Sequence, residues 1–392
     1  MPDLETLVEI FRDQFKLAPT LLARAPGRIN LAGEHVDYNE GVVLPAAIDR
    51  CVQIVAAPQA GNTVTIRALD LNETVTFHLD QLAQHAQVDG KPLPTWASYP
   101  AGVAWALQEE GYSVAGMQAV FSSEVPIGAG LSSSAAVEVA FGFAWQALGG
   151  WQAEPLTLAQ ICQRAENLYV GIRCGLMDQF ASACGMAEQV LIFDTRSLEW
   201  ESLSLTQGTA IVVADTGLRR SLGAIAYNER RAACEQAVRL LQRYHPDIKA
   251  LRDISSVEFA AYSDFLPPEI RKRAQHIVVE MARVDQAISC LRRGDIQYFG
   301  GLMYASHQSL RDLYEVSCPE IDYLVEATRK LPGCYGARLS GAGFGGCTVN
   351  LVDETQVEEF IQELREKYRR HTGQEARLYL CHASAGASAR GL

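Results

Sequence analysis

Apolar and polar residues alternate along this chain with two periods, which predict where helices and strands lie. In residues 4–15 the apolar side chains recur at helical spacing, so an amphipathic helix is expected there. Short runs of β-branched residues separated by turns follow from residue 21 and predict strands. The other elements expected in the first half are strands at residues 51–56, 63–68, 73–77, 118–123 and 190–194, and helices at residues 99–109, 133–148 and 157–170.

Long helical patterns dominate the second half of the chain. The elements expected here are helices at residues 221–244, 268–293 and 354–371, strands at residues 210–215 and 376–381, and a strand–turn–strand unit at residues 335–351. A strand-rich half therefore gives way to a helix-rich half near residue 200. This predicts an α+β protein with an N-terminal domain at residues 1–200 and a C-terminal domain at residues 201–392.

Composition and charge narrow the class of protein. The chain has 392 residues, 48% of them apolar, and a net charge of −12, which argues against nucleic acid or an anionic membrane as the main partner. A small anionic cofactor is compatible with this charge, because backbone amides and local arginines can hold phosphates. The acidic N-terminus, the absence of a membrane-length apolar run and ten scattered cysteines predict a cytoplasmic protein with reduced thiols.

The most informative segment is residues 25–39, where polar side chains are crowded into a short stretch. Glu34, His35, Asp37, Tyr38 and Asn39 all donate or accept hydrogen bonds, which is a poor way to build a core. It is a good way to surround a small molecule rich in hydroxyls, since each hydroxyl needs a donor and an acceptor. The alternative, from these residues alone, is a solvated polar loop.

A glycine- and serine-rich segment lies between a predicted strand and a predicted helix. Its glycines let the backbone approach an anion, its serines are N-cap candidates, and the amides at the helix start can bind phosphate. No lysine follows the glycines, so it is not a Walker A loop, and the alternative is a well-capped helix after a glycine turn. The candidate phosphate-binding residues are Gly128, Ala129, Gly130, Leu131, Ser132, Ser133 and Ser134.

A second glycine cluster occupies residues 341–346 and formally satisfies Gly-x-Gly-x-x-Gly. A dinucleotide-binding fingerprint requires a helix after the glycines, whereas residues 347–352 are β-rich. The dinucleotide interpretation therefore fails on its context. The cluster is expected to form the turn of a hairpin.

These three segments resemble those of a known family. Residues 27–38 resemble the galactokinase signature Gly-Arg-x-Asn-Leu-x-Gly-Glu-His-x-Asp-Tyr, departing from the common pattern at Ala32. Residues 126–136 and 341–346 resemble the second and third motifs of the GHMP kinases, to which galactokinases belong. The resemblance covers essentially the whole chain. It implies two α+β domains with the active site in the cleft between them, and phosphorylation of the C1 hydroxyl of α-D-galactose by MgATP.

The resemblance also implies roles for single residues. Asp178, within a Cys-Gly-x-x-Asp-Gln segment, would accept the proton of the C1 hydroxyl, and Arg28 beside it would stabilise the transferred phosphoryl group. Ser134 and Glu166 would hold Mg²⁺, and the glycine- and serine-rich segment would hold ATP. The residues implied around the sugar are Glu34, His35, Val36, Asp37, Gly175, Asp178 and Tyr227.

Two alternatives stay open at this point. The first is a related sugar-1-kinase acting on N-acetylgalactosamine or arabinose, and the second is a non-catalytic sensor of galactose and ATP. The intact segment at residues 128–136, with Arg28, Asp178 and Glu166 present, favours catalysis over the sensor. Mevalonate and homoserine kinases should lack the Glu34–Tyr38 run, and no Gly-x-Ser-x-Gly elbow supports a hydrolase. A monomer or weak homo-oligomer is expected.

Overall fold

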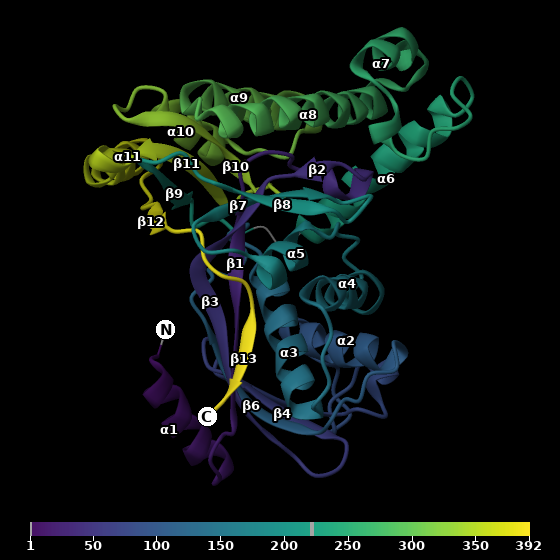
Figure 1. The fold of residues 1–392 in the computed structure, drawn as a ribbon, viewed down its shortest axis with the longest axis vertical. Helices are drawn as coiled ribbons and strands as arrows, with labels where there is room; N and C mark the ends of the chain where they lie inside the picture. The colour runs from purple at the N-terminus through teal and green to yellow at the C-terminus, as the bar shows by residue number, and fades with distance from the viewer. Residues whose placement is uncertain (1, 220–222) are drawn as a thin grey trace.

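The computed structural model describes residues 2–219 and 223–392, and its elements form two main sheets with helices packed on them (Figure 1). The first sheet has six strands in the order β13-β1-β3-β6-β4-β5, antiparallel except for the parallel pair of β4 and β6. Its strands are β1 (Leu21–Asn30), β3 (Pro45–Pro58), β4 (Thr63–Ala68), β5 (Glu73–His78), β6 (Met117–Ser123) and β13 (Ser388–Gly391).

Helices cover both faces of this sheet. Successive side chains of each strand point to opposite faces, so both faces carry apolar side chains that need to be covered. Helix α1 (Leu4–Phe15) packs Leu7 and Phe11 on one face, against Leu22, Val55 and Val120. The opposite face belongs to the large core that also contains the apolar residues of the other helices of this half. Those helices are α2 (Thr95–Glu109), α3 (Ser133–Gly149), α4 (Pro155–Ala165) and α5 (Met177–Cys184).

The second sheet is antiparallel throughout, in the order β10-β11-β9-β12. Alternate residues of β9 divide between two cores: Ile211 and Val213 join the large core, whereas Val212 and Ala214 pack with Phe360 and other residues of the outer helices. The strands are β9 (Thr209–Asp215), β10 (Cys334–Ser340), β11 (Cys347–Asp353) and β12 (Arg377–Cys381), and the helices are α8 (Pro268–Arg293), α9 (Ile296–Ser309), α10 (Pro319–Thr328) and α11 (Val357–Thr372).

The remaining elements connect the two sheets. A small sheet has the order β2-β7-β8, formed by β2 (Val42–Val43), β7 (Gln189–Asp194) and β8 (Trp200–Ser204). Helices α6 (Gly223–Leu241) and α7 (Ser256–Tyr262) lie at one end of the molecule, where α7 projects outward in Figure 1. Among the described helices, none combines the length and apolar character needed to cross a membrane.

The α+β class and most predicted elements are confirmed, α8 at its predicted bounds. The predicted helix at residues 221–244 corresponds to α6, although residues 221 and 222 lie outside those described. Helix α9 was missed because Gly300 and Gly301 lower helix propensity in its middle. A Cβ on Gly300 would overlap the Tyr335 carbonyl, so this glycine allows α9 to pack closely on β10.

The domain boundary near residue 200 stays a prediction. One feature of the topology bears on where the two halves meet: β13, the last strand of the chain, pairs antiparallel with β1 in the first sheet. In Figure 1 this yellow strand runs down beside the purple β1, close to the N-terminal helix α1. The end of the chain therefore packs with the first half of the sequence.

Candidate active site

A pocket of about 280 Å³ lies where the two halves of the chain meet. Three segments form most of its wall: residues 31–39 after β1, which we call the signature loop; residues 126–134, which run into the first two residues of α3, the phosphate loop; and residues 341–346 between β10 and β11, the glycine turn. Among the predicted site residues, those that line the pocket are Arg28, Glu34, His35, Asp37, Gly128, Gly130, Ser132, Ser133, Ser134, Glu166, Asp178 and Tyr227.

The signature loop turns sharply, so that its polar side chains enter the pocket although they are almost fully buried. His35 has φ 64°, in the left-handed region, and Asp37 starts a 3₁₀ turn at Asp37–Asn39. The Nδ1 atom of His35 lies 2.9 Å from the hydroxyl of Tyr38, which lies 2.6 Å from the hydroxyl of Tyr314. Burial holds the pKa of His35 well below its usual value, so this imidazole is neutral at pH 7.

Asp37 faces the segment that carries Asp178. Gly175 does not itself line the pocket, but a Cβ on it would overlap the Asp37 carboxylate, so its role is to leave room for that side chain. Burial, together with the neighbouring charges of Asp178 and Glu34, raises the pKa of Asp37 to about 7. The amides of Tyr38 and Met177 act in the opposite direction, because they favour the ionised form.

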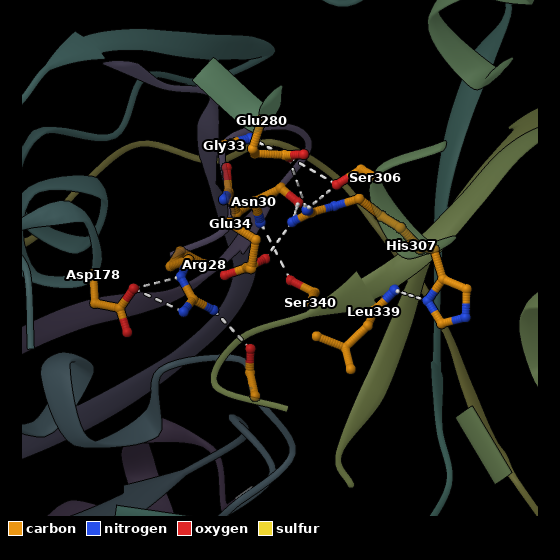
Figure 2. A network of polar contacts seen from close by, with 12 residues as sticks. Arg28, Asn30, Gly33, Glu34, Asp178, Glu280, Ser306, His307, Leu339 and Ser340 are labelled. Atoms are coloured by element: carbon orange, nitrogen blue, oxygen red, sulfur yellow. Dashed lines mark hydrogen bonds and ion pairs between the residues drawn. The ribbon is translucent and has the colours of Figure 1, made fainter. Parts of the chain in front are cut away.

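Arg28 and Asp178, which both line the pocket, form an ion pair (Figure 2). Both Nε and Nη2 of Arg28 lie 2.7 Å from Asp178 Oδ1, and Arg28 Nη1 donates to the carbonyl of Gly130 at 2.6 Å. The second carboxylate oxygen, Oδ2, accepts the hydroxyl of Ser132 at 2.5 Å. Burial alone would lower the pKa of Arg28, but Asp178 and Glu34 outweigh it and raise the pKa. The carboxylate is thus held by the strand β1 and by the phosphate loop.

Backbone conformations in the phosphate loop expose the start of α3. Gly128 has φ 68° and Gly130 has φ 79°, values that glycine adopts at little cost. Ser132 is the N-cap residue of α3 but has a left-handed backbone (φ 58°, ψ 48°); its side chain makes no capping bond, and its hydroxyl donates to Asp178. Of the serines expected as N-cap candidates, Ser132 takes the N-cap position without the capping bond. Because the Ser132 hydroxyl does not accept a bond from the first amides of α3, these amides are available to an anion.

The glycine turn packs directly on the phosphate loop. A Cβ on Gly130 would lie 2.5 Å from the carbonyl oxygen of Ser340, and one on Gly346 would lie 2.9 Å from that of Ala129. Only glycines allow the two loops to approach this closely. The turn joins the antiparallel strands β10 and β11, which confirms the predicted hairpin and excludes the dinucleotide fold at these residues.

Ser134 and Glu166 offer oxygen atoms beside the phosphate loop. Both line the pocket, and Ser134 lies within hydrogen-bonding reach of Glu166. Burial and the nearby Asp178 raise the pKa of Glu166 to about 7, and Gln179 donates to it at 2.6 Å. In the described part of the chain, no three His, Cys, Asp or Glu side chains are grouped to hold a metal by themselves. One carboxylate and one hydroxyl suit an ion such as Mg²⁺ that arrives with phosphate oxygens and keeps waters.

Several predicted site residues face away from the pocket with their side chains. Val36, in the signature loop, is fully buried and packs against Gly41. Ala129 and Leu131 are fully buried in the core, so the backbone of the phosphate loop, rather than these side chains, faces the pocket. Tyr227 on α6 is in the wall, with its ring centroid 5.5 Å from that of His35.

Two buried residues of β10 and α8 that bond the signature loop were not predicted from the sequence. Arg338 on β10 is fully buried and pairs with Glu34, and the fully buried Glu280 on α8 accepts the amide of Gly33 at 3.2 Å. One signal was available, since an arginine in a strand of buried residues next to a glycine turn is unusual. A glutamate in a long polar helix gives no such signal.

Three segments of the chain match known families. Residues 98–186 match the GHMP kinases N terminal domain, residues 287–370 match the GHMP kinases C terminal family, and residues 9–58 match the galactokinase galactose-binding signature. The signature match covers β1, the signature loop and all of β3. The first match includes the phosphate loop and Asp178.

Relatives match over nearly the whole chain. A galactokinase of Roseiflexus sp. (strain RS-1) is 44% identical over 386 residues, which cover 98% of this chain and 97% of the relative. A galactokinase of Chloroflexus aggregans (strain MD-66 / DSM 9485) is 41% identical over 388 residues, or 99% and 98% of the two chains.

Solved structures agree with these relatives. The Lactococcus lactis galactokinase complexed with galactose has a TM-score of 0.92 at 33% identity, with 98% of this chain and 99% of the other covered. The mevalonate kinase of Methanococcus jannaschii has a TM-score of 0.65 at 18% identity, with 92% and 98% covered, and shares the fold.

Proposed function

The chain belongs to the galactokinase family, and on that premise we propose that the pocket between its signature loop and its phosphate loop is where the γ-phosphoryl group of ATP is transferred to the C1 hydroxyl of galactose. One observation carries this assignment to the pocket. The Arg28–Asp178 pair lies where a loop suited to a polyhydroxyl ligand meets a loop suited to phosphates.

Asp178 is the proton acceptor in the proposed step. The C1 hydroxyl oxygen of α-D-galactose attacks the γ-phosphorus, its proton moves to Asp178, and the bond to the bridging oxygen breaks to leave ADP. Arg28 and Ser132 hold the carboxylate from two sides, so it is aimed before the sugar binds. Arg28 also places positive charge beside the phosphoryl oxygens, where negative charge gathers in the transition state.

ATP is proposed to bind with its phosphates against the phosphate loop and the start of α3. The amides of the helix and the positive end of its dipole favour negative charge at this point. Arg219 lies at the edge of the loop: its Nε donates to the carbonyl of Ile127 at 2.5 Å, and Asp215 holds its guanidinium at 2.7 and 2.8 Å. The pair fixes the guanidinium beside the place where phosphates would bind, with part of its positive charge offset by Asp215.

Mg²⁺ is proposed to bind at Ser134 and Glu166. The ion would neutralise charge on the nucleotide phosphates, and the two side chains would fix its place beside the phosphate loop. Gln179 positions the glutamate, because its amide donates to Glu166 at 2.6 Å and to Glu138 at 2.9 Å.

We expect Glu166→Gln to raise the Mg²⁺ concentration needed for half-maximal activity by on the order of 10- to 100-fold, since a neutral amide is a weaker ligand for a hard cation. The measurement is a Mg²⁺ titration of initial rate at fixed ATP. Glu138→Gln is the matched control, because Glu138 is in the same buried cluster and bonds the same Gln179. Equal Mg²⁺ dependence in the wild type and Glu166→Gln would contradict this site.

Galactose binding is expected to strengthen as pH rises through about 7. The pKa of Asp37 is raised to about 7, so its carboxylate is mostly neutral at pH 6 and mostly ionised at pH 8. The ionised form accepts stronger hydrogen bonds from sugar hydroxyls, and the dissociation constant should therefore fall by roughly tenfold between these two pH values.

Calorimetric titration of galactose without ATP, from pH 5.5 to 8.5, measures this dependence. Asp37→Asn should bind more weakly and show a flat profile, whereas Glu34→Gln should retain a step but at lower pH, because it removes one of the charges that raise the pKa of Asp37. A wild-type affinity that does not change over this range would remove Asp37 as a titrating sugar ligand.

Substrate choice is tested by ADP release from MgATP with galactose, N-acetylgalactosamine, glucose and arabinose. Turnover on galactose should exceed that on glucose, because the wrong C4 epimer leaves a buried acceptor unpaired at about 1–3 kcal/mol. Preference for N-acetylgalactosamine or arabinose would assign the chain to a related sugar-1-kinase activity.

A cytoplasmic location and a monomeric or weakly associated state complete the proposal. Light scattering tests the state of association.

A further inference from the structure

Glu34 receives its ion-pair partner from the opposite half of the chain. Glu34 lines the pocket although the residue is only 2% exposed, and its Oε2 accepts a bond from Nη2 of Arg338 on β10. The two residues are 304 positions apart. Arg338 itself is fully buried, so its charge is shielded from solvent and acts on the groups around it.

Contacts on several sides fix the Arg338 guanidinium. Its Nη2 also donates to the carbonyl of Asn30 at 2.8 Å, its Nη1 lies 3.4 Å from Ser306 Oγ, and Glu280 Oε1 lies 4.0 Å from Nη1. Ser306 in turn donates to Glu280 at 2.7 Å. Figure 2 shows Asn30, Gly33 and Glu34 of the first half gathered against Glu280 and Ser306 of the second.

The network reaches the backbone of the signature loop as well as its side chain. Gly33 donates its amide to Glu280 Oε1 at 3.2 Å, directly before Glu34. Burial opposes the ionisation of Glu280, but Arg283, His276 and Arg338 hold its pKa below the ordinary value. The backbone amide of Gly33 is therefore bonded to a charged group on α8, and the side chain of Glu34 to one on β10.

Burial also acts on Glu34. It raises the pKa of this carboxyl, while Arg338 and Arg28 act against the rise, together with the amide of Gly341 in the glycine turn. Arg28 is already bonded to Asp178 and to the carbonyl of Gly130. Arg338 is thus the cation that bonds Glu34 directly, and it keeps one carboxylate oxygen in a fixed place.

We propose that Arg338 is a positioning residue for sugar recognition: it holds Glu34 ionised and oriented to accept one hydroxyl of the sugar, and so determines discrimination for that hydroxyl. This inference rests on the proposed galactose site. It separates two buried arginines by role, because Arg28 lines the pocket and acts on the transferred group, whereas Arg338 acts through Glu34.

A purely structural role for Arg338 predicts a different outcome. If the arginine only fastened the two halves together, its replacement would lower stability and affect all sugars alike. If it positions Glu34, its replacement should weaken the recognition of one hydroxyl of the sugar and leave the recognition of the others unchanged. The two roles can be separated with sugars that lack one hydroxyl at a time.

The experiment measures kcat and KM for galactose and for its 2-, 3-, 4- and 6-deoxy analogues. Glu34→Gln first identifies the hydroxyl that donates to Glu34. In this variant, the deoxy sugar that lacks that hydroxyl should have the same kcat/KM as galactose. Arg338→Lys keeps a buried positive charge but loses the planar fork that reaches Glu34 and Asn30 together. We expect its penalty for that same deoxy sugar to fall from on the order of 100-fold to less than 10-fold, mainly through KM.

Arg283→Lys is the matched control, because Arg283 pairs with Glu280 in the same network. It should lower the melting temperature while leaving the deoxy-sugar pattern as in the wild type. Turnover by Arg338→Lys could be too slow to measure. For that case, calorimetric titration of Arg338→Gln with galactose measures sugar binding directly. Both Arg338 variants should keep the wild-type KM for ATP.

Two results would overturn the inference: an unchanged penalty for every deoxy sugar in the Arg338 variants, or an equal loss for all sugars that follows the loss of stability. Failure of the proposed function looks different, since the wild type itself would then show no turnover of galactose.

Discussion

Asp178→Asn is expected to lower kcat by on the order of 10²- to 10⁴-fold while galactose binding stays largely intact. The amide has the shape of the carboxylate and can still accept a bond from Arg28, but it cannot take the proton of the C1 hydroxyl. Phosphoryl transfer has a loose transition state, so part of the loss would come from weaker alignment and charge compensation.

The measurement combines steady-state kinetics with calorimetric titration of galactose and a melting curve. The melting curve is needed because Arg28 is 3% exposed and loses its charged partner. Ser132→Ala is the matched control: it removes the bond to Asp178 Oδ2 and should cost much less in kcat. A folded Asp178→Asn protein with near-normal kcat would remove the base from the mechanism.

Arg28→Met is expected to lower kcat by on the order of 10²- to 10³-fold, the cost of losing one preorganised charged donor at the reacting group. Methionine has a similar length without charge, so Asp178 would lose both bonds to its Oδ1 and the phosphate loop would lose the bond to Gly130. Arg28→Lys restores the charge without the fork and should recover only part of the rate.

The double variant Arg28→Met, Asp178→Asn tests whether the two residues act as a unit. Their effects on kcat should be far from additive, because each single change already disrupts the same ion pair. Rapid-quench single-turnover kinetics measures the chemical step apart from product release. Independent, additive losses would show that Arg28 and Asp178 contribute to separate steps.

Much of this site could be predicted because its residues lie in short, continuous motifs. The signature loop, the phosphate loop and the Asp178 segment each combine turn-forming glycines with polar side chains, and the structure brings all three to one pocket. The hairpin at residues 341–346 could also be predicted, since β-rich residues follow the glycines. Local sequence chemistry was sufficient for these features.

Other features depend on contacts between distant segments. The pairing of Arg338 with Glu34 spans 304 positions, and no local pattern specifies it. Ser132 appears in sequence to be an ordinary N-cap, but the approach of Asp178 redirects its hydroxyl. Helix α9 contains two glycines, of which Gly300 is required by its packing on β10, so propensity argued against a helix that tertiary structure stabilises.

The most direct test of the central claim is to incubate the wild-type protein with MgATP and galactose and to follow the products by phosphorus NMR. We expect ADP and a sugar phosphate whose phosphorus couples to H1 of the α anomer, which identifies transfer to the C1 hydroxyl. Phosphate on another hydroxyl would contradict the placement of Asp178 against C1. Unchanged ATP beside calorimetrically bound galactose would contradict catalysis and indicate a sensor.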